Sequence, residues 1–341
     1  MKILLLLSFN LLLIYLLNKI FIKKNILLDR KILSHKNFVS SDVVPISGGF
    51  IIIINLLLLN SNFLNNIFFF GMFCLGLLSD LLILKKPLKK FLFQAVIVIT
   101  FSFFLGISIS TTKIFFIDYL IKDKLFALLF TSFCLLILIN GSNFLDGINT
   151  LVCGYYILII LVILYLGHYD KINYNFENFI NLLVSLIVII LFNFFSKTYL
   201  GDSGTFLLSF IIGYQLINLY NTNLNDLKYI SPVFILLLLW YPAMENLFSI
   251  IRKYFNNKNP SQPDNLHLHH LLFCYLNQKL KNNVNINSYT GIIINLYNFI
   301  IFLAAVNFFN KSTYLLFFLI FNIFFYVIIY FFLLKKKFNK N

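Results

Sequence analysis

Residues 124–167 read KLFALLFTSFCLLILINGSNFLDGINTLVCGYYILIILVILYLG, which is two apolar runs joined by a short polar segment. A bilayer core of about 30 Å needs about 20 apolar residues in helical form. Each run is close to that length, and neither carries a charged side chain beyond Lys124. The stretch therefore predicts two membrane-spanning helices whose polar connection lies at one face of the membrane.

The rest of the chain has the same character. Of its 341 residues, 60% are hydrophobic and only 11% are charged, whereas soluble domains are about 25% charged. This composition predicts an all-α polytopic membrane bundle that forms a single domain over residues 1–341. Apolar runs predict eleven spans, near 3–22, 47–61, 64–84, 91–110, 124–140, 150–167, 179–195, 203–220, 231–251, 289–309 and 313–334.

The basic residues indicate the orientation. With the N-terminus outside and the C-terminus in the cytoplasm, 20 of the 27 Lys and Arg residues lie in cytoplasmic loops, as the positive-inside rule requires. The net charge of +15 is then a topology signal, and no nucleic-acid partner is expected. The loops expected to form the active-site face are 23–46, 79–90, 140–149, 196–204 and 252–288. The outer loops 62–66, 169–178 and 221–228 show no pattern typical of a site.

Three acids stand beside these apolar runs, all at the predicted cytoplasmic face: Asp80, Asp146 and Asp202. An unpaired carboxylate at such a position costs several kcal/mol. Acids gathered at one face of an apolar bundle are typical of a hydrated divalent metal that holds a phosphorylated substrate. We therefore expect the three carboxylates to converge.

Residues 140–154 read NGSNFLDGINTLVCG, with Asn140, Asn143 and Asp146 spaced i, i+3, i+6. On a helix this spacing lines three polar groups along one edge. A helix stop followed by an Asn cap on the next helix explains Gly147 and Asn149. It does not explain Asn140 and Asn143, which favour a functional role.

Two further segments carry candidate ligands. In residues 200–205, LGDSGT, Asp202 begins a span, where it could cap the helix or hold Mg²⁺ against phosphates bound at the helix N-terminus. In residues 76–94, Lys90 and Gln94 are one helical turn apart and follow Asp80.

Residues 263–271, PDNLHLHHL, hold three of the five histidines. Zinc is one reading, but the segment has neither a Cys partner nor the His-Glu-x-x-His spacing. Partly protonated histidines that bind phosphate or nucleotide oxygens are the favoured reading.

Taken together, these blocks resemble the polyprenyl-phosphate N-acetylhexosamine-1-phosphate transferases, and most closely the GlcNAc-1-phosphate transferase branch, which the His-Leu-His-His-Leu form favours. The resemblance runs from Asp29 to Leu271. Its blocks are Asp29, His35, Pro45, Gly48 and Gly49; Gly76 to Gln94; Asn140 to Gly154; Phe192, Asn193 and Gly201 to Thr205; and Arg252 with His267 to His270.

The resemblance implies transfer of a HexNAc-1-phosphate, expected to be GlcNAc-1-phosphate, from a UDP-sugar to undecaprenyl or another polyprenyl phosphate. It implies Mg²⁺ or Mn²⁺ as cofactor, held by Asp202 first and Asp80 next. It also implies a multi-pass protein of the bacterial cytoplasmic membrane, active at its cytoplasmic face, and a homodimer. The catalytic acids would be Asp80, Asp146 and Asp202. The substrate-binding residues would be Lys90, Asn140, Asn143, Asn193, Arg252, His267, His269 and His270.

The chain departs from the family pattern at Ser79, Asn149 and Glu245, where the family often has Asp. The reaction does not require an acid at position 79 as a base, because a lipid phosphate monoester with a second pKa of about 6 is already largely dianionic at pH 7. Two other readings are a lipid-linked sugar transporter and a non-catalytic relative. A CDP-alcohol phosphotransferase is disfavoured because Ile-Asn-Thr-Leu follows Asp146-Gly147.

Overall fold

The computed structural model describes residues 2–29, 43–59, 62–224, 229–259, 264–280 and 285–338. His35, part of the first block of the resemblance, lies outside the described residues. Helices make up most of the fold. They are α1 (Lys2–Lys24), α2 (Gly48–Leu59), α3 (Phe63–Asp80), α4 (Pro87–Leu105), α5 (Phe115–Ile121), α6 (Lys124–Leu145), α7 (Leu151–His168), α8 (Glu177–Phe194), α9 (Gly201–Thr222), α10 (Pro232–Leu238), α11 (Trp240–Phe255), α12 (Leu268–Lys279), α13 (Ile286–Val306) and α14 (Ser312–Phe338).

The all-α polytopic class is confirmed, but the count of eleven spans is not. Among the described residues, nine helices are long and apolar enough to cross a membrane, or ten if a bent pair counts as one span. Each expected span coincides with a helix or a helix pair. The second is only the 12-residue α2, which is too short to cross about 30 Å at 1.5 Å per residue.

The ninth expected span, 231–251, is not one helix. It is broken into α10 and α11, whose axes differ by 73°. Pro242 explains the break, because proline has no N–H to donate to the carbonyl four residues earlier, at Leu238. The hydroxyl of Tyr155 donates to that carbonyl instead, at 2.7 Å. A buried hydrogen bond from α7 thus stabilises the bend.

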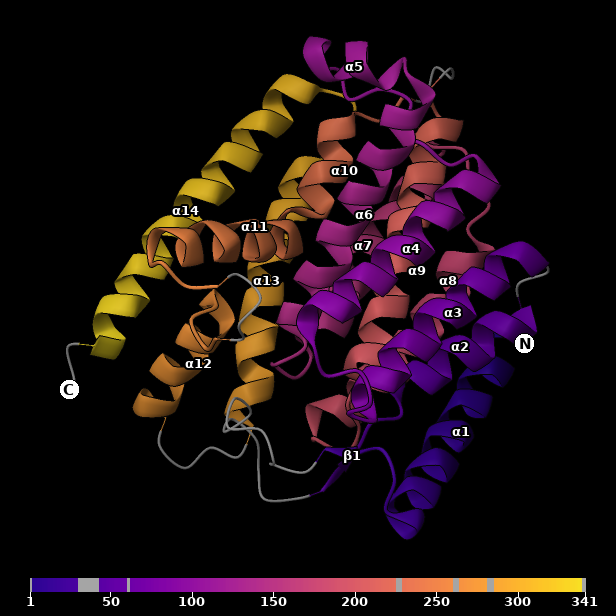
Figure 1. Cartoon of the computed structure of the whole chain (residues 1–341), viewed down its shortest axis with the longest axis vertical. Helices are drawn as coiled ribbons and strands as arrows, with labels where there is room; N and C mark the ends of the chain where they lie inside the picture. Colours follow the sequence, from indigo (N-terminus) through magenta and orange to yellow (C-terminus); the bar gives the residue numbers. More distant parts are fainter. Residues whose placement is uncertain are drawn as a thin grey trace.

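Helix α11 carries its polar side chains inward. Glu245, Ser249 and Lys253 are buried, whereas Ile251 and Tyr254 are more than half exposed. This arrangement is the reverse of a soluble amphipathic helix and suits an element with lipid on its outer side. In Figure 1, α11 lies across the bundle rather than along it. The segment 252–288, expected to connect two spans, contains the last turn of α11, the whole of α12 and the start of α13.

Helix α9 is the centre of the bundle. Its membrane-length window is 89% buried, compared with 11% for α1 and 22% for α14, which Figure 1 shows on opposite sides of the molecule. Glycines allow close packing around the centre: a Cβ on Gly76 of α3 would lie 2.4 Å from Cα of Ser203 on α9. Likewise, a Cβ on Gly141 of α6 would lie 2.0 Å from the carbonyl oxygen of Pro242 on α11.

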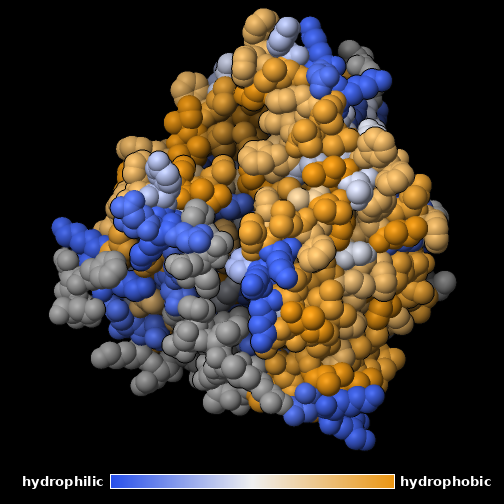
Figure 2. Space-filling view, in the orientation of Figure 1, coloured by the Kyte–Doolittle hydropathy of each residue, from blue (hydrophilic) through white to orange (hydrophobic). Residues whose placement is uncertain are grey.

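A small sheet closes one end of the bundle. Strands β1 (Leu28–Asp29) and β2 (Val44–Pro45) are antiparallel. Ile46 forms a parallel bridge with Tyr199, whose N–H donates to the carbonyl of Pro45 at 2.9 Å. Figure 1 shows β1 and α5 at opposite ends of the bundle. A broad apolar surface lies between these ends, with polar residues above and below it (Figure 2), as expected for a bilayer-embedded protein.

Candidate active site

Asp80 and Asp202 meet at the sheet end of the bundle. The Asp80 carboxylate, at the last residue of α3, accepts the backbone N–H of Asp202 at 2.9 Å and of Ser203 at 3.0 Å. These amides belong to the first turn of α9, where N–H groups have no partner within the helix. A side chain from α3 therefore caps α9, and its negative charge faces the positive end of the helix dipole.

Asp202 itself contacts the neighbouring helices. Its Oδ2 accepts a hydrogen bond from Ser79 and an ion-paired hydrogen bond from Nζ of Lys90 at 2.9 Å. The side chains of Lys90 and Asp202 are 24% and 23% exposed, so a ligand can reach them. Asp80, Asp202 and Lys90, three candidates from the sequence, therefore lie together in the structure.

Two glycines make this approach possible. Gly201 has φ of +72°, a conformation that a residue with a Cβ rarely adopts. A Cβ there would also lie 2.8 Å from Oδ2 of Asp80. Gly76, one turn before Asp80, allows α3 to touch the backbone of α9. The Gly residues of both sequence blocks thus bring the two acids together.

Asn140 joins α6 to this group. Its side-chain N–H donates to Oε1 of Gln94 at 3.1 Å and to the carbonyl of Leu136 at 2.9 Å. Gln94 is one turn beyond Lys90 on α4, so Asn140 lies beside the helix that provides the lysine. Asn143 is half-buried on the last turns of α6, which extends to Leu145 and makes most of the expected loop 140–149 helical.

Asp146 follows α6 at the same end of the bundle and is half-buried. Burial raises the pKa of Tyr199, and the nearby charges of Asp29 and Asp146 raise it further. Asp146 therefore lies within electrostatic reach of Tyr199, two residues before Gly201. The three acids are at one end of the bundle, but the expectation that all three carboxylates converge is wrong: within the described residues, no three His, Cys, Asp or Glu side chains are grouped to hold a metal ion.

Asn193 is buried and bonded to backbone on both sides. Its carbonyl accepts the N–H of Thr150 at 2.6 Å, and its amide donates to the carbonyl of Thr198 at 2.9 Å. Thr150 has φ of +64°, an uncommon value for a β-branched residue. These contacts position the segments before α7 and α9. They give Asn193 an architectural role alongside the ligand-binding role predicted from the sequence.

The three histidines surround a buried acid. Glu245 on α11 lies 2.9 Å from Nδ1 of His267 and 3.4 Å from Nδ1 of His269. The rings of His269 and His270 are 4.4 Å apart. This cluster contacts the end of α6: the ring of His267 packs on Phe144 at 4.8 Å, and a Cβ on Gly147 would lie 2.7 Å from His270.

The charge state expected for this cluster needs correction. Burial lowers the pKa of His269 despite the opposing effect of Glu245, and burial lowers the pKa of His270 well below its usual value. Both rings are therefore neutral at pH 7, whereas the sequence suggested partly protonated histidines. A neutral imidazole still donates one hydrogen bond.

Arg252 is held by a bidentate ion pair. Its Nη2 donates to both carboxylate oxygens of Asp264, at 2.8 and 2.7 Å, and its Nη1 to the hydroxyl of Tyr330 at 3.1 Å. It thereby fixes the segment before the histidines against α11 and α14. Any role in binding phosphate would have to compete with Asp264.

Glu245 and Gln94 complete the site; both were noticed in the sequence, but neither was assigned a role there. Glu245 is an acid inside an apolar run, and that signal alone marks a functional position in membrane helices. Gln94 was noticed only for its spacing from Lys90. Tyr155 and Asp264 carried no comparable signal, because their partners lie 83 and 12 residues away in the chain.

The donor set suits magnesium better than a metal caged by protein. Within the described ranges, no three His, Cys, Asp or Glu side chains are grouped to hold a metal ion. Mg²⁺ usually takes one or two carboxylates together with water and substrate phosphates. Asp202 fits this requirement because it is reachable, and both of its contacts use the same oxygen. Asp80 fits less well, since each oxygen already accepts a backbone N–H.

Such a bundle, with acids, a lysine and histidines gathered at one end, defines a polytopic membrane protein with a polar site at one membrane face. The sequence profile of glycosyl transferase family 4 matches residues 63–220, from α3 to α9. The match includes Asp80, Lys90, Asp146 and Asp202, but not the histidines. The chain is therefore similar to this family over the segment from α3 to α9.

Two curated relatives agree with that assignment. The chain is 29% identical over 255 residues to the undecaprenyl-phosphate alpha-N-acetylglucosaminyl 1-phosphate transferase of Thermotoga maritima, covering 74% of this chain and 75% of that protein. It is 28% identical over 144 residues to the "Probable undecaprenyl-phosphate N-acetylglucosaminyl 1-phosphate transferase" of Bacillus subtilis, covering 40% of this chain and 37% of that protein.

Proposed function

We propose that this protein transfers GlcNAc-1-phosphate from UDP-GlcNAc to undecaprenyl phosphate, giving undecaprenyl-diphosphate-GlcNAc and UMP. The names of both relatives support the acceptor and the transferred group. The single structural observation that carries the proposal is the ion pair of Asp202 and Lys90 at the start of α9, partly exposed and capped by Asp80. It offers a reachable acid for a metal ion and a cation for a phosphate oxygen.

In the proposed reaction, an oxygen of the lipid phosphate attacks the sugar-linked phosphorus of the UDP-sugar. The bond from that phosphorus to the oxygen of UMP breaks, and UMP leaves. The nucleophile is already largely dianionic at pH 7, so no protein base is needed. The protein must align two anions and screen their charge. Ser79 in place of an acid is compatible with this chemistry.

We assign the residues as follows. Asp202 would hold Mg²⁺, which supplies screening of the diphosphate and of the departing UMP. Lys90 lies beside Asp202 and would contact a phosphate oxygen. Asp80 orients the first turn of α9 through its two backbone hydrogen bonds. Asn140, Asn143 and Asp146 would bind the nucleotide or diphosphate along the end of α6.

The histidine cluster gives the second wall of the site. Glu245 accepts Nδ1–H of His267 at 2.9 Å, which fixes the orientation of that imidazole. His269 and His270 would donate to the nucleotide or diphosphate, while His267, whose Nδ1–H is taken by Glu245, would hold this segment against Phe144 at the end of α6. Arg252 holds the preceding segment through Asp264 and supports the cluster rather than the substrate.

The lipid tail needs an apolar path from the bilayer. Figure 2 shows a hollow walled by apolar residues between α14 and the central helices. In Figure 1, α11 follows the 73° bend from α10 and lies beside α14. We assign the polyprenyl chain to this hollow. The site would face the cytoplasm of a bacterial cell, where UDP-sugars are made.

Purified protein in nanodiscs, given radiolabelled UDP-GlcNAc, undecaprenyl phosphate and MgCl₂, tests the proposal. We expect label in the lipid phase and UMP in the aqueous phase, both abolished by EDTA. Asp202→Asn should lower the rate by at least about 100-fold, as when one electrostatic stabiliser of a transition state is removed. Asp170→Asn, an exposed acid between α7 and α8, is the matched control. No lipid-phase label with any UDP-HexNAc donor would refute the transferase assignment.

A further inference from the structure

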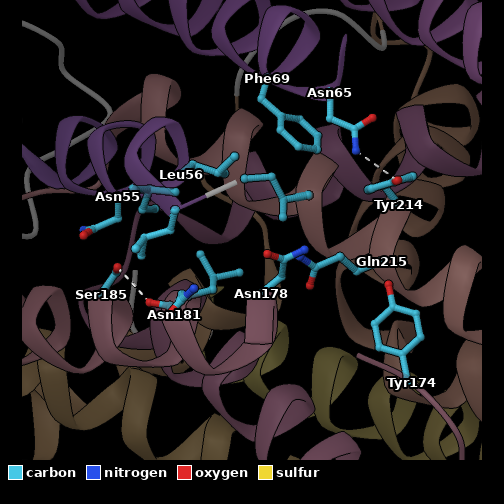
Figure 3. Close-up of a pocket in the computed structure, with 14 residues that line it drawn as sticks. Asn55, Leu56, Asn65, Phe69, Tyr174, Asn178, Asn181, Ser185, Tyr214 and Gln215 are labelled. Atoms are coloured by element: carbon cyan, nitrogen blue, oxygen red, sulfur yellow. Dashed lines mark hydrogen bonds between the residues drawn. The ribbon is translucent and has the colours of Figure 1, made fainter. Parts of the chain in front are cut away.

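A second polar cavity lies at the other end of the bundle. It is bounded by α2, α3, α8, α9 and the segment before α8, and it has a volume of about 70 Å³. Figure 3 shows the side chains of Asn178, Gln215 and Tyr174 turned toward one another within it. The remaining wall includes Asn65, Phe69 and Tyr214.

This cavity is separate from the active site. On α3, Asn65 is 15 residues from Asp80, which is about 22 Å along a helix. On α9, Gln215 is 13 residues from Asp202, or about 20 Å. The lining residues Asn65, Tyr174 and Asn178 fall in or next to the segments that had been expected to hold no site. The sequence of these segments shows no site pattern, because the cavity forms only where they pack around α9.

The cavity wall contains hydrogen-bonding groups without partners. Gln215 Oε1 and Asn65 Oδ1 are buried and accept no hydrogen bond in the described part of the chain, and the two side chains are 5% and 6% exposed. Asn55 Oδ1, at the edge of the cavity on α2, is in the same state. Each such group costs about 1–3 kcal/mol unless something donates to it. Three unpartnered acceptors around one cavity indicate an occupant that supplies donors.

The lining also restricts the charge of that occupant. None of the lining residues is charged, so a phosphate or a cation would enter without a counter-ion, at high cost. The amides of Asn178, Asn181 and Gln215 offer both donors and acceptors. The rings of Phe69 and Tyr214, with centroids 6.0 Å apart, give apolar faces beside these amides.

We infer that this cavity binds an uncharged, hydroxyl-rich group, such as a sugar ring or a glycerol moiety. Its hydroxyls donate to Gln215 and Asn65, and its carbon face packs on the aromatic rings. The same chemistry could come from the head group of a neutral glycolipid or from a free glycoside. The inference is independent of the proposed transferase activity, because it uses none of the residues of that site.

The test uses the full chain in nanodiscs of phosphatidylcholine and phosphatidylethanolamine, neither of which has a hydroxyl-rich head group. Monoglucosyl-diacylglycerol is the lipid-borne probe, methyl β-glucoside is the free probe, and phosphatidic acid is the charged control. We expect at least one glucosyl probe to raise Tm saturably by about 2–4 °C, with no rise from phosphatidic acid. A response to the lipid alone identifies a head group, and a response to both probes identifies a glycoside site.

Two variants locate the binding. Gln215→Leu should weaken binding of the glucosyl probe by at least about ten-fold, since it removes a buried acceptor. Tyr174→Phe removes one hydroxyl from a half-buried side chain and serves if Gln215→Leu does not fold. Asn322→Leu, a buried amide on α14 outside the cavity, is the matched control and should bind normally. The inference is wrong if neither probe shifts Tm, if phosphatidic acid competes, or if both cavity variants bind like the wild type.

Discussion

Asp80 caps the helix that carries Asp202, since its two carboxylate oxygens accept the backbone amides of Asp202 and Ser203 at 2.9 and 3.0 Å. One acid thus positions another across two helices that are more than 100 residues apart in the chain. This contact separates two roles that the sequence assigned together. Asp80 orders the first turn of α9, whereas the Asp202 side chain stays partly exposed, where a ligand can reach it.

Exchanging each acid for its amide should separate these roles. Asp80→Asn turns one acceptor into a donor that faces a backbone N–H, so we expect a loss of about 1–3 kcal/mol in unfolding free energy together with lost activity. Asp202→Asn removes a partly exposed ion pair worth about 0–1 kcal/mol, so its Tm should change little while activity is lost. Thermal unfolding and turnover are measured on both variants.

The reverse pattern would contradict this division. If Asp202→Asn lowered Tm and Asp80→Asn left it unchanged, the capping role of Asp80 would be wrong. Equal loss of activity in both variants, with equal Tm, would restore the simpler view in which both acids are metal ligands.

The close approach of α3 and α9 gives a second prediction. A Cβ on Gly76 would lie 2.4 Å from Cα of Ser203, whereas a Cβ on Gly71 of the same helix meets nothing within 4 Å. Gly76→Ala must push the helices apart and separate Asp80 from the amides it caps. We expect a fall in Tm of several degrees and a loss of transferase activity.

Gly71→Ala is the matched control, and it should be neutral or slightly stabilising because Ala favours a helix over Gly by about 1 kcal/mol. Comparable losses in the two variants would show that helix propensity or expression, and not the contact with Ser203, determines the result.

The main polar contacts could be predicted because membrane helices confine charge to their ends. Asp80, Lys90 and Asp202 each stood next to a long apolar run, and threading the runs through a bilayer placed all three at one face. Threading the spans predicted only the end of the bundle at which these three side chains lie. The capping of α9 by Asp80 depends on the crossing of α3 and α9, which the spacing of residues along either helix does not encode.

The break between α10 and α11 shows a feature that the sequence indicated, through Pro242, but that the long apolar run hid. Residues 231–251 are apolar enough to read as one helix, yet Pro242 frees the carbonyl of Leu238 inside it. The break could have been suspected from the proline. The stability of the broken helix could not have been predicted, because the hydroxyl of Tyr155 that hydrogen-bonds this carbonyl comes from another helix. Glu245 was similarly visible as an acid in an apolar run, but its histidine partners were not.

Ser79 gives a prediction about the chemistry. Its hydroxyl donates to Asp202, at the position where the family often has an acid. If the lipid phosphate needs no protein base, Ser79→Ala should cost only one hydrogen bond to a charged group, which is about 1.5–3 kcal/mol at most and less at a partly exposed site. We expect the turnover rate to fall by no more than about ten-fold.

The pH profile distinguishes the two explanations. A group acting as a base would add a rising limb to kcat, and Ser79→Ala would remove it. An unchanged profile with a modest loss of rate supports alignment by hydrogen bonding. A loss of more than about 1,000-fold would show that the Ser79 hydroxyl takes part in proton transfer.

The neutral histidines predict a pH-dependent stability. Burial lowers the pKa of His270, with His269, His267 and Lys337 adding to the effect and Glu245 opposing it. The pKa in the unfolded chain is about 6.5, so the unfolded state binds more protons below that pH. Stability is therefore complete above about pH 6.5 and falls as the pH drops, by about 1.4 kcal/mol per pH unit for each fully depressed histidine.

Tm measured from pH 8 to pH 5 in nanodiscs checks this prediction. We expect a plateau above about pH 7 and a decline below it, which His270→Gln should make shallower. His168→Gln, at the exposed end of α7, is the control and should keep the wild-type slope. A Tm that rises as the pH falls would mean that Glu245 outweighs burial and that the buried cluster prefers the imidazolium form. In that case the histidines would screen substrate phosphates as cations, and not as neutral donors.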